Sequence, residues 1–213
     1  ILLLFDLISV DRQYVNSDNF VTALKVDKPY QANAADKEIL KDKGHFRVLD
    51  MSSEGQSKPG RAAYFHNSLF GYQYIIAEEQ GSIFPYTNTE TNGNAWFVSE
   101  LKQLTDANIE IKALDSLDTK TKAVTTQSDF SDKPEVIFYT VDSTASIQLK
   151  AHKPNYLKYE SNNLNEGLAV FSEVYYKDGW NAYLNGNLVP HIRVNYVLRA
   201  LETPKGNHTI EFK

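Results

Sequence analysis

The sequence contains no cysteine, which excludes disulfides, thiolate metal sites and a cysteine nucleophile. This absence does not decide the compartment, because many bacterial extracytoplasmic proteins also lack cysteine. Lysine and arginine are scattered and the formal net charge is −5, so there is no clustered basic face for nucleic acid and no basic run for anionic lipid. We therefore expect no nucleic-acid partner.

Common catalytic motifs are missing as well. The chain has no G-x-S-x-G, no P-loop, no G-x-G-x-x-G and no H-E-x-x-H. Its five histidines do not follow metal-ligand spacing. The sequence predicts no catalytic residue, no cofactor and no metal site.

Long apolar runs are absent, and the nearest approach to one is "ILLLF" at residues 1–5. A transmembrane helix needs about 20 apolar residues, whereas Asp6 and Asp11 follow almost at once. Two interpretations stay open for residues 1–5: a buried first strand, or the end of a membrane helix.

Aromatic residues are abundant, with 13 Tyr and 11 Phe, and they favour pleated, half-buried surfaces. Strand and helix patterns alternate up to residue 126, and short strands separated by turns follow. The prediction is an α+β fold, predominantly β: a small α/β lobe over 1–126, followed by an antiparallel β-sandwich or jelly-roll lobe over 127–213.

Two helices and one turn are well specified. Asn33 is a plausible N-cap for a helix within 33–43, and Thr105 or Asp106 can cap a helix over 105–117. The apolar stripe of the second helix should pack on a sheet that includes Val48 and Phe97; it consists of Ile109, Ala113, Leu114 and Leu117. Asn185-Gly186 predicts a type I′ hairpin turn.

Trp180 and Glu173 belong to the stretch "EVYYKDGWNAYLNGNLV" (173–189). Burying a tryptophan removes roughly 150–250 Å² from water, an upper bound of about 4–6 kcal/mol, so packing is a sufficient role for Trp180. A role in stacking on sugars would require an exposed ring. We expect Glu173 to be solvated or paired with Arg193 or Arg199.

Several segments together resemble the YfhO-type bacterial membrane proteins, particularly those of Bacteroides-like bacteria. The segments that carry this resemblance are "DLISVDRQYV" (6–15), "RVLDM" (47–51), "AAYFHNSLFGY" (62–72), "GNAWFV" (93–98) and the long block 167–213 with "GLAVFSEVYY", "VNYVLRAL" and "GNHTIEF". There is one departure. In relatives a longer basic and polar stretch follows "SLFGY", whereas here Tyr72 is followed directly by Gln73, which implies a deleted or omitted segment.

The resemblance implies a polytopic protein of the bacterial cytoplasmic membrane, similar to GT-C-type glycosyltransferases that use polyprenyl-phosphate sugars. This chain would be its extracytoplasmic, periplasm-facing region, with its own transmembrane region as partner and residues 1–5 as a helix end. The catalytic acid of such enzymes lies in a membrane loop outside this sequence, so the region would not be catalytic in isolation. Trp180 would be a core residue of the family.

Three functions follow as hypotheses: an accessory domain of such a membrane protein, a carbohydrate-binding β-sandwich module, or a structural domain that contacts envelope proteins. If the region contacts a glycan or a polyprenyl-phosphate sugar, we expect polar and planar side chains to do so, with arginine suited to phosphate. The candidates are His66, Asn67, Tyr72, Arg193 and Asn195. The alternatives are an ordered loop around His66, and an Arg193 that pairs with Glu173.

Overall fold

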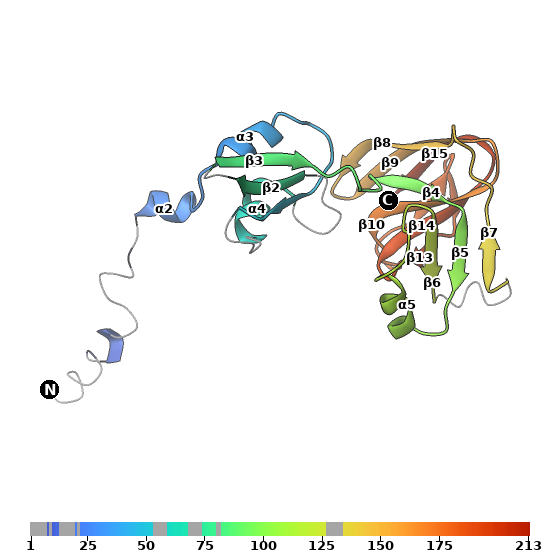
Figure 1. Cartoon of the computed structure of the whole chain (residues 1–213), viewed down its shortest axis with the longest axis horizontal. Helices are drawn as coiled ribbons and strands as arrows, with labels where there is room; N and C mark the ends of the chain where they lie inside the picture. Colours follow the sequence, from blue (N-terminus) through green and yellow to red (C-terminus); the bar gives the residue numbers. More distant parts are fainter. Residues whose placement is uncertain are drawn as a thin grey trace.

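The computed structural model describes residues 8, 10–12, 20, 22–52, 59–67, 74–79, 82–126 and 134–213, to which the following account is confined. Within these residues the strands form four sheets, and the helices are few and short (Figure 1). The predicted α+β, predominantly β fold class is confirmed.

Two antiparallel sheets form a sandwich-like unit. One sheet has the order β13-β14-β10-β4 and the other has the order β12-β11-β15-β9-β8. The strands of the first are β4 (Ala95–Val98), β10 (Gly167–Val174), β13 (Ile192–Val194) and β14 (Leu198–Thr203). The strands of the second are β8 (Ser146–Lys153), β9 (Tyr156–Asn163), β11 (Ala182–Leu184), β12 (Asn187–Val189) and β15 (Gly206–Phe212).

Aromatic side chains from both sheets fill the core of the sandwich. Tyr159, Phe171 and Phe212 are fully buried and meet edge to face, with ring centroids 4.9 to 6.2 Å apart. Such pairs add to the free energy gained from area burial alone. Leu157 and Leu201 complete the contact between the two sheets.

A third sheet covers the other face of the four-stranded sheet. It has the order β6-β5-β7, with β5 (Glu100–Gln103), β6 (Lys122–Thr125) and β7 (Val136–Phe138). Leu101 and Ala123 from this sheet share a buried cluster with Leu168 and Val194. Helix α5 (Ala107–Ala113) connects β5 to β6.

A small fourth sheet forms the N-terminal part. It has the order β1-β2-β3, where β1 (Val48–Asp50) is parallel to β2 (Tyr74–Glu79) and β3 (Ser82–Thr87) is antiparallel to β2. The helices of this part are α2 (Ala23–Asp27), α3 (Ala34–Ile39) and α4 (Pro59–Phe65). Figure 1 shows this sheet beside the sandwich, to which the chain passes after β3.

Strand pairing crosses residue 126, where the sequence predicts the lobe boundary. β4 precedes that residue and pairs with β10, and β5 precedes it and pairs with β7. Strands β4 and β5, which the sequence assigns to the first lobe, therefore lie in or against the sandwich. The alternation of apolar and polar residues predicts which face of a strand is buried, but it does not predict which strand it pairs with. The division into two domains stays a prediction.

The predicted helix caps are confirmed, but the expected face of the second helix is wrong. Asn33 forms a capping box on α3, and Asp106 accepts from two backbone amides at the start of α5. Ile109 is 45% exposed, whereas Glu110 is fully buried. The helix is anchored through the Glu110 carboxylate, which accepts hydrogen bonds from Arg193 on β13, from the Thr126 hydroxyl and from the Tyr196 amide.

The Asn185-Gly186 turn is as predicted. Its residues have φ values of 50° and 84°, and the turn joins β11 to β12 with Leu184 opposite Asn187. Residues 1–5 and the Tyr72–Gln73 junction lie outside the described residues.

Candidate functional site

A large pocket in the described part of the chain lies around Trp96 on β4. It has a volume of about 580 Å³. Its lining, which we call the Trp96 pocket, combines an indole and aliphatic groups with amides and two charged side chains: Arg47, Asn88, Glu90, Asn92, Trp96, Leu114, Val174, Asn195, Val197 and Leu198. A mostly apolar hollow with a few polar groups is typical of a small-molecule site.

The polar loop before β4 is shaped by its own hydrogen bonds. Asn88 Oδ1 accepts from the Glu90 amide at 3.0 Å, and Thr91 Oγ1 donates to the Asn88 carbonyl at 3.3 Å. Trp96 Nε1 donates to the Thr119 carbonyl at 2.8 Å, which fixes the indole. The loop and the ring are therefore preorganised on one side of the pocket.

Glu90, in the polar loop before β4, forms an ion pair. Lys120 Nζ lies 2.7 Å from Glu90 Oε2, and this hydrogen bond lowers the pKa of Glu90. The carboxylate is therefore ionised at neutral pH and offers acceptors at the pocket. Val174 and Val197 also line the pocket and are 62% and 45% exposed, so apolar surface is open to a ligand.

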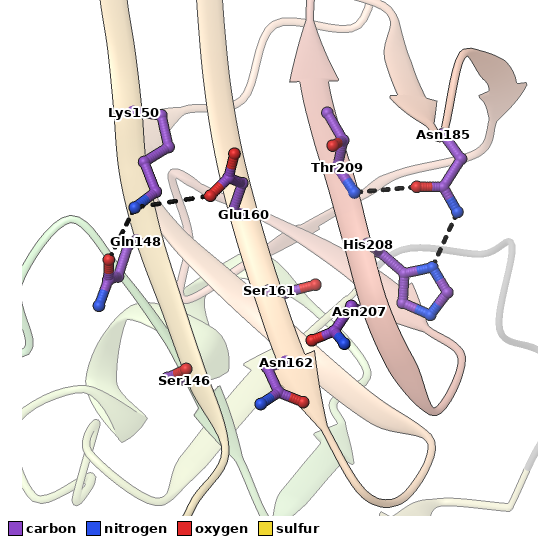
Figure 2. A pocket seen from close by; sticks show the side chains of 10 residues that line it. All are labelled: Ser146, Gln148, Lys150, Glu160, Ser161, Asn162, Asn185, Asn207, His208 and Thr209. Atoms are coloured by element: carbon purple, nitrogen blue, oxygen red, sulfur yellow. Dashed lines mark hydrogen bonds and ion pairs between the residues drawn. The ribbon is translucent and has the colours of Figure 1, made fainter.

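A second, polar pocket lies on the outer face of the five-stranded sheet. Figure 2 shows its side chains on β8, β9 and β15, with Asn185 reaching in from the hairpin turn. Its volume is about 400 Å³. Strand register aligns Ser146, Asn162 and Asn207 in one row across three strands. Neighbouring strands lie about 4.7–4.9 Å apart, so this row presents a hydroxyl and two amides over about 10 Å.

The flanks of this outer-face pocket are already engaged by neighbours (Figure 2). Lys150 Nζ contacts Glu160 Oε2 at 3.5 Å and donates to Gln148 Oε1 at 3.0 Å. Asn185 accepts from the Thr209 amide at 2.9 Å and contacts His208 Nδ1 at 2.9 Å. The chemistry left for a ligand is therefore the neutral row at the centre.

A cluster of two histidines and one glutamate lies near the Trp96 pocket. The donor atoms of His45, His152 and Glu173 all lie within 4.8 Å of one another. Burial and the neighbouring His45 lower the pKa of His152. Burial raises the pKa of Glu173, but His45 and the charges of Arg47 and Arg199 outweigh it, so that pKa is lowered. These residues lie far apart in sequence, so no local spacing could have revealed them.

Two of the predicted site residues, Arg193 and Asn195, lie together where the end of β13 meets β6 of the third sheet. Arg193 Nη2 lies 3.0 Å from Glu110 Oε2, and the Tyr196 amide donates to Glu110 Oε1 at 2.8 Å. Asn195 Oδ1 accepts from the Val124 amide at 3.0 Å. Arg193 thus pairs with Glu110 and not with Glu173, while Asn195 also lines the Trp96 pocket.

The other predicted site residues belong to the N-terminal part. His66 is buried, and its Nε2 lies 3.1 Å from Asp36 Oδ1, while the side chain of Asn67 is exposed. Tyr72 lies outside the described residues. His66 contacts Asp36 and the Asn67 carbonyl accepts from the Val48 amide, both within the N-terminal part, so these residues do not join Arg193 and Asn195 in one cluster. Ligand binding by these residues stays a prediction.

Trp180 and Glu173 have packing roles that differ in detail from the expectation. Trp180 is partly buried against the sandwich core, with the Arg199 guanidinium 4.3 Å from its ring. Glu173 lies at a register shift in β10, with Oε1 3.7 Å from His45 Nε2. Its histidine neighbour could not be expected from the strand pattern alone.

Comparisons with protein-family models, curated proteins and solved structures gave no match. The resemblance to YfhO-type proteins is therefore neither supported nor opposed by them. Within the described ranges, no helix is long and apolar enough to cross a membrane.

Proposed function

We propose that this chain is a glycan-binding module that has no catalytic activity of its own, with the Trp96 pocket as the binding site. The observation that carries the proposal is the lining of that pocket. A tryptophan and aliphatic groups can cover the apolar face of a sugar ring, while Asn88, Asn92 and Glu90 offer hydrogen bonds to its hydroxyls.

The size of the pocket supports the same ligand class. A volume of about 580 Å³ lies within the roughly 300–1,000 Å³ of small-molecule sites, and it leaves room for a short oligosaccharide. Arg47 lines the same pocket and suits an anionic group on the ligand, such as a phosphate or a uronic acid.

The test is a glycan array followed by NMR titration of the isolated chain. We expect binding of an oligosaccharide, lost in Val174→Arg, because that exposed side chain lines the pocket and the longer one fills it. The matched control is Asn162→Ala with Asn207→Ala on the outer face, which should bind as the wild type does. Loss in the control with retention in Val174→Arg would move the site to the outer-face pocket. No binding to any glycan would contradict the proposal.

The cellular setting of the module is a further part of the proposal and rests on the YfhO-type resemblance. We propose that it is the extracytoplasmic part of a polytopic bacterial membrane protein, and that it presents a glycan to a transmembrane region. Determining the complete coding sequence tests this, because apolar segments of about 20 residues should flank the region. Turnover of a polyprenyl-phosphate sugar by this chain alone would contradict the non-catalytic assignment.

A further inference from the structure

Three side chains with metal-binding chemistry converge where the N-terminal part meets the sandwich. His45 precedes β1, His152 lies near the end of β8, and Glu173 lies in β10. The imidazole rings of His45 and His152 are stacked, with centroids 3.7 Å apart and planes inclined by 19°. His45 Nε2 lies 3.7 Å from Glu173 Oε1.

Contacts outside the cluster hold together the segments that carry His45 and Glu173. Arg47 Nη2 donates to the Ser172 carbonyl at 3.0 Å, which ties the segment before β1 to the strand that carries Glu173. The register shift between Phe171 and Val174 in β10 sets the direction of Glu173 locally. The segments that carry His45 and Glu173 would therefore lie side by side even without attraction among the three side chains.

The donor set favours a transition metal. Zinc binds histidine nitrogen at about 2.0–2.1 Å and carboxylate oxygen at about 2.0–2.2 Å, which places tetrahedral donors about 3.3–3.5 Å apart. The His45–Glu173 distance of 3.7 Å is close to this value, whereas the nearly parallel rings of His45 and His152 must rotate before both nitrogens can face one ion. Calcium and magnesium prefer sets of oxygen ligands, and one carboxylate does not provide such a set.

Two arginines lie near Glu173 and affect which kind of metal ion can bind there. Arg199 Nε donates to the Val174 carbonyl at 2.8 Å and its guanidinium covers Trp180, while Arg47 bonds to Ser172. The positive charge of these arginines repels a cation that binds mainly through electrostatic attraction. The repulsion matters less for a transition-metal ion, which also forms coordination bonds to neutral imidazoles.

We propose that His45, His152 and Glu173 bind one divalent transition-metal ion of the zinc, nickel or copper type, with a fourth coordination position left for water or a ligand. Because His45 comes from the segment before β1 and the other ligands from the sandwich, the ion would connect the two parts. The site does not depend on the glycan-binding proposal.

The test is calorimetric titration of chelator-treated protein with Zn²⁺. We expect one ion per chain, and His152→Ala and Glu173→Gln should each weaken the affinity by at least about tenfold, since loss of second-shell partners alone costs 10–100-fold. His152 is exposed and Glu173→Gln preserves shape, so both variants should fold. Mg²⁺ at the same concentration should give no binding heat.

The matched control is His208→Ala, which removes an imidazole that lies outside the cluster. It should bind Zn²⁺ with the affinity of the wild type. Histidine NMR signals provide a second readout, because Zn²⁺ should shift the imidazole resonances of His45 and His152 and leave that of His208 in place. Absence of Zn²⁺ binding in the wild type, or equal affinity in His152→Ala and Glu173→Gln, would overturn the proposal.

Discussion

The N-terminal sheet buries an ionic network beside a small apolar core, whereas the core of the sandwich is aromatic. The apolar core of the N-terminal sheet is small and aliphatic, formed by Ala35, Ile39, Val48 and Ile76. Beside it lies a buried ionic network in which Arg61 bonds both Asp36 and Asp50 and His66 contacts Asp36. The sandwich instead buries an aromatic cluster around Phe171.

This difference predicts how the stability of each part responds to substitutions. Aromatic burial stabilises in proportion to area and volume, so the sandwich should respond most to deletions in its core. A buried ionic network stabilises only while every charge has its partner, so the N-terminal sheet should respond most to lost charges. The following changes test this contrast.

Phe171→Ala should produce the largest effect. The ring is fully buried and contacts Tyr159 and Phe212, so its deletion should lower the free energy of unfolding by about 3–5 kcal/mol. Urea denaturation monitored by circular dichroism measures this loss. The matched control is Phe138→Ala, where the ring is 76% exposed and the change should stay within about 0.5 kcal/mol. Equal losses would show that the aromatic core does not hold the sandwich.

Asp36→Asn should have a smaller effect, confined to the N-terminal sheet. The change removes the charge that faces Arg61 and His66, but Arg61 keeps Asp50 at 2.6 Å, so we expect a loss of about 1.5–3 kcal/mol. Hydrogen exchange should show reduced protection of β1 and β2 amides, with β9 and β10 unchanged. Glu38→Gln on the exposed side of α3 is the control and should change little. Loss of protection in the sandwich would contradict the contrast.

The parts of the fold that could be predicted are those fixed by neighbours in sequence. Asn33 and Asp106 cap helices and Asn185-Gly186 turns a hairpin, because each effect acts within three or four residues. The alternating strands after residue 134 were likewise predictable. The strand β3 is harder to predict, because it contains Pro85, which weakens a strand pattern.

Long-range partners could not be predicted. The carboxylate of Glu110 accepts from the Tyr196 amide and pairs with Arg193, more than 80 positions away in the sequence. His45, His152 and Glu173 come together only because β8 and β10 lie beside the segment before β1. The Trp96 pocket combines a loop, a strand and residues near β14, although a second tryptophan beside a polar loop was a visible hint.

Acidification should weaken the two parts in succession. Burial, with Arg199 nearby, lowers the pKa of His191 in the sandwich from 6.5 to about 4. Protons then bind the unfolded chain first, so stability that is present above pH 6.5 is lost as pH falls towards 4. Because the ring is only partly buried, we expect a loss of about 1–2 kcal/mol.

The N-terminal sheet should lose stability only at lower pH. Burial raises the pKa of Asp50, but Ser52 and Arg61 outweigh it and lower that pKa below 3.8, so its contribution is lost as pH falls below about 4. Urea midpoints measured from pH 7 to 3 check this order. His191→Gln should reduce the fall in the urea midpoint between pH 6.5 and 4, and His208→Gln should not. A first decline that survives in His191→Gln would assign it to another group.

Gly186→Ala and Gly93→Ala should produce the smallest effects, and together they compare the hairpin with the connection between the parts. Gly186 and Gly93 have φ values of 84° and 79°, and an added Cβ would contact nothing within 4 Å at either position, so only backbone strain is introduced. The strand pairs on both sides of the hairpin prevent the backbone from relaxing, so Gly186→Ala should cost about 1–2 kcal/mol.

Gly93 lies in the loop between β3 and β4, outside any strand, and Gly93→Ala should cost less than half as much because the loop can adjust. Thermal unfolding of the two variants measures the difference. Equal costs would mean that the connection is held as rigidly as the hairpin.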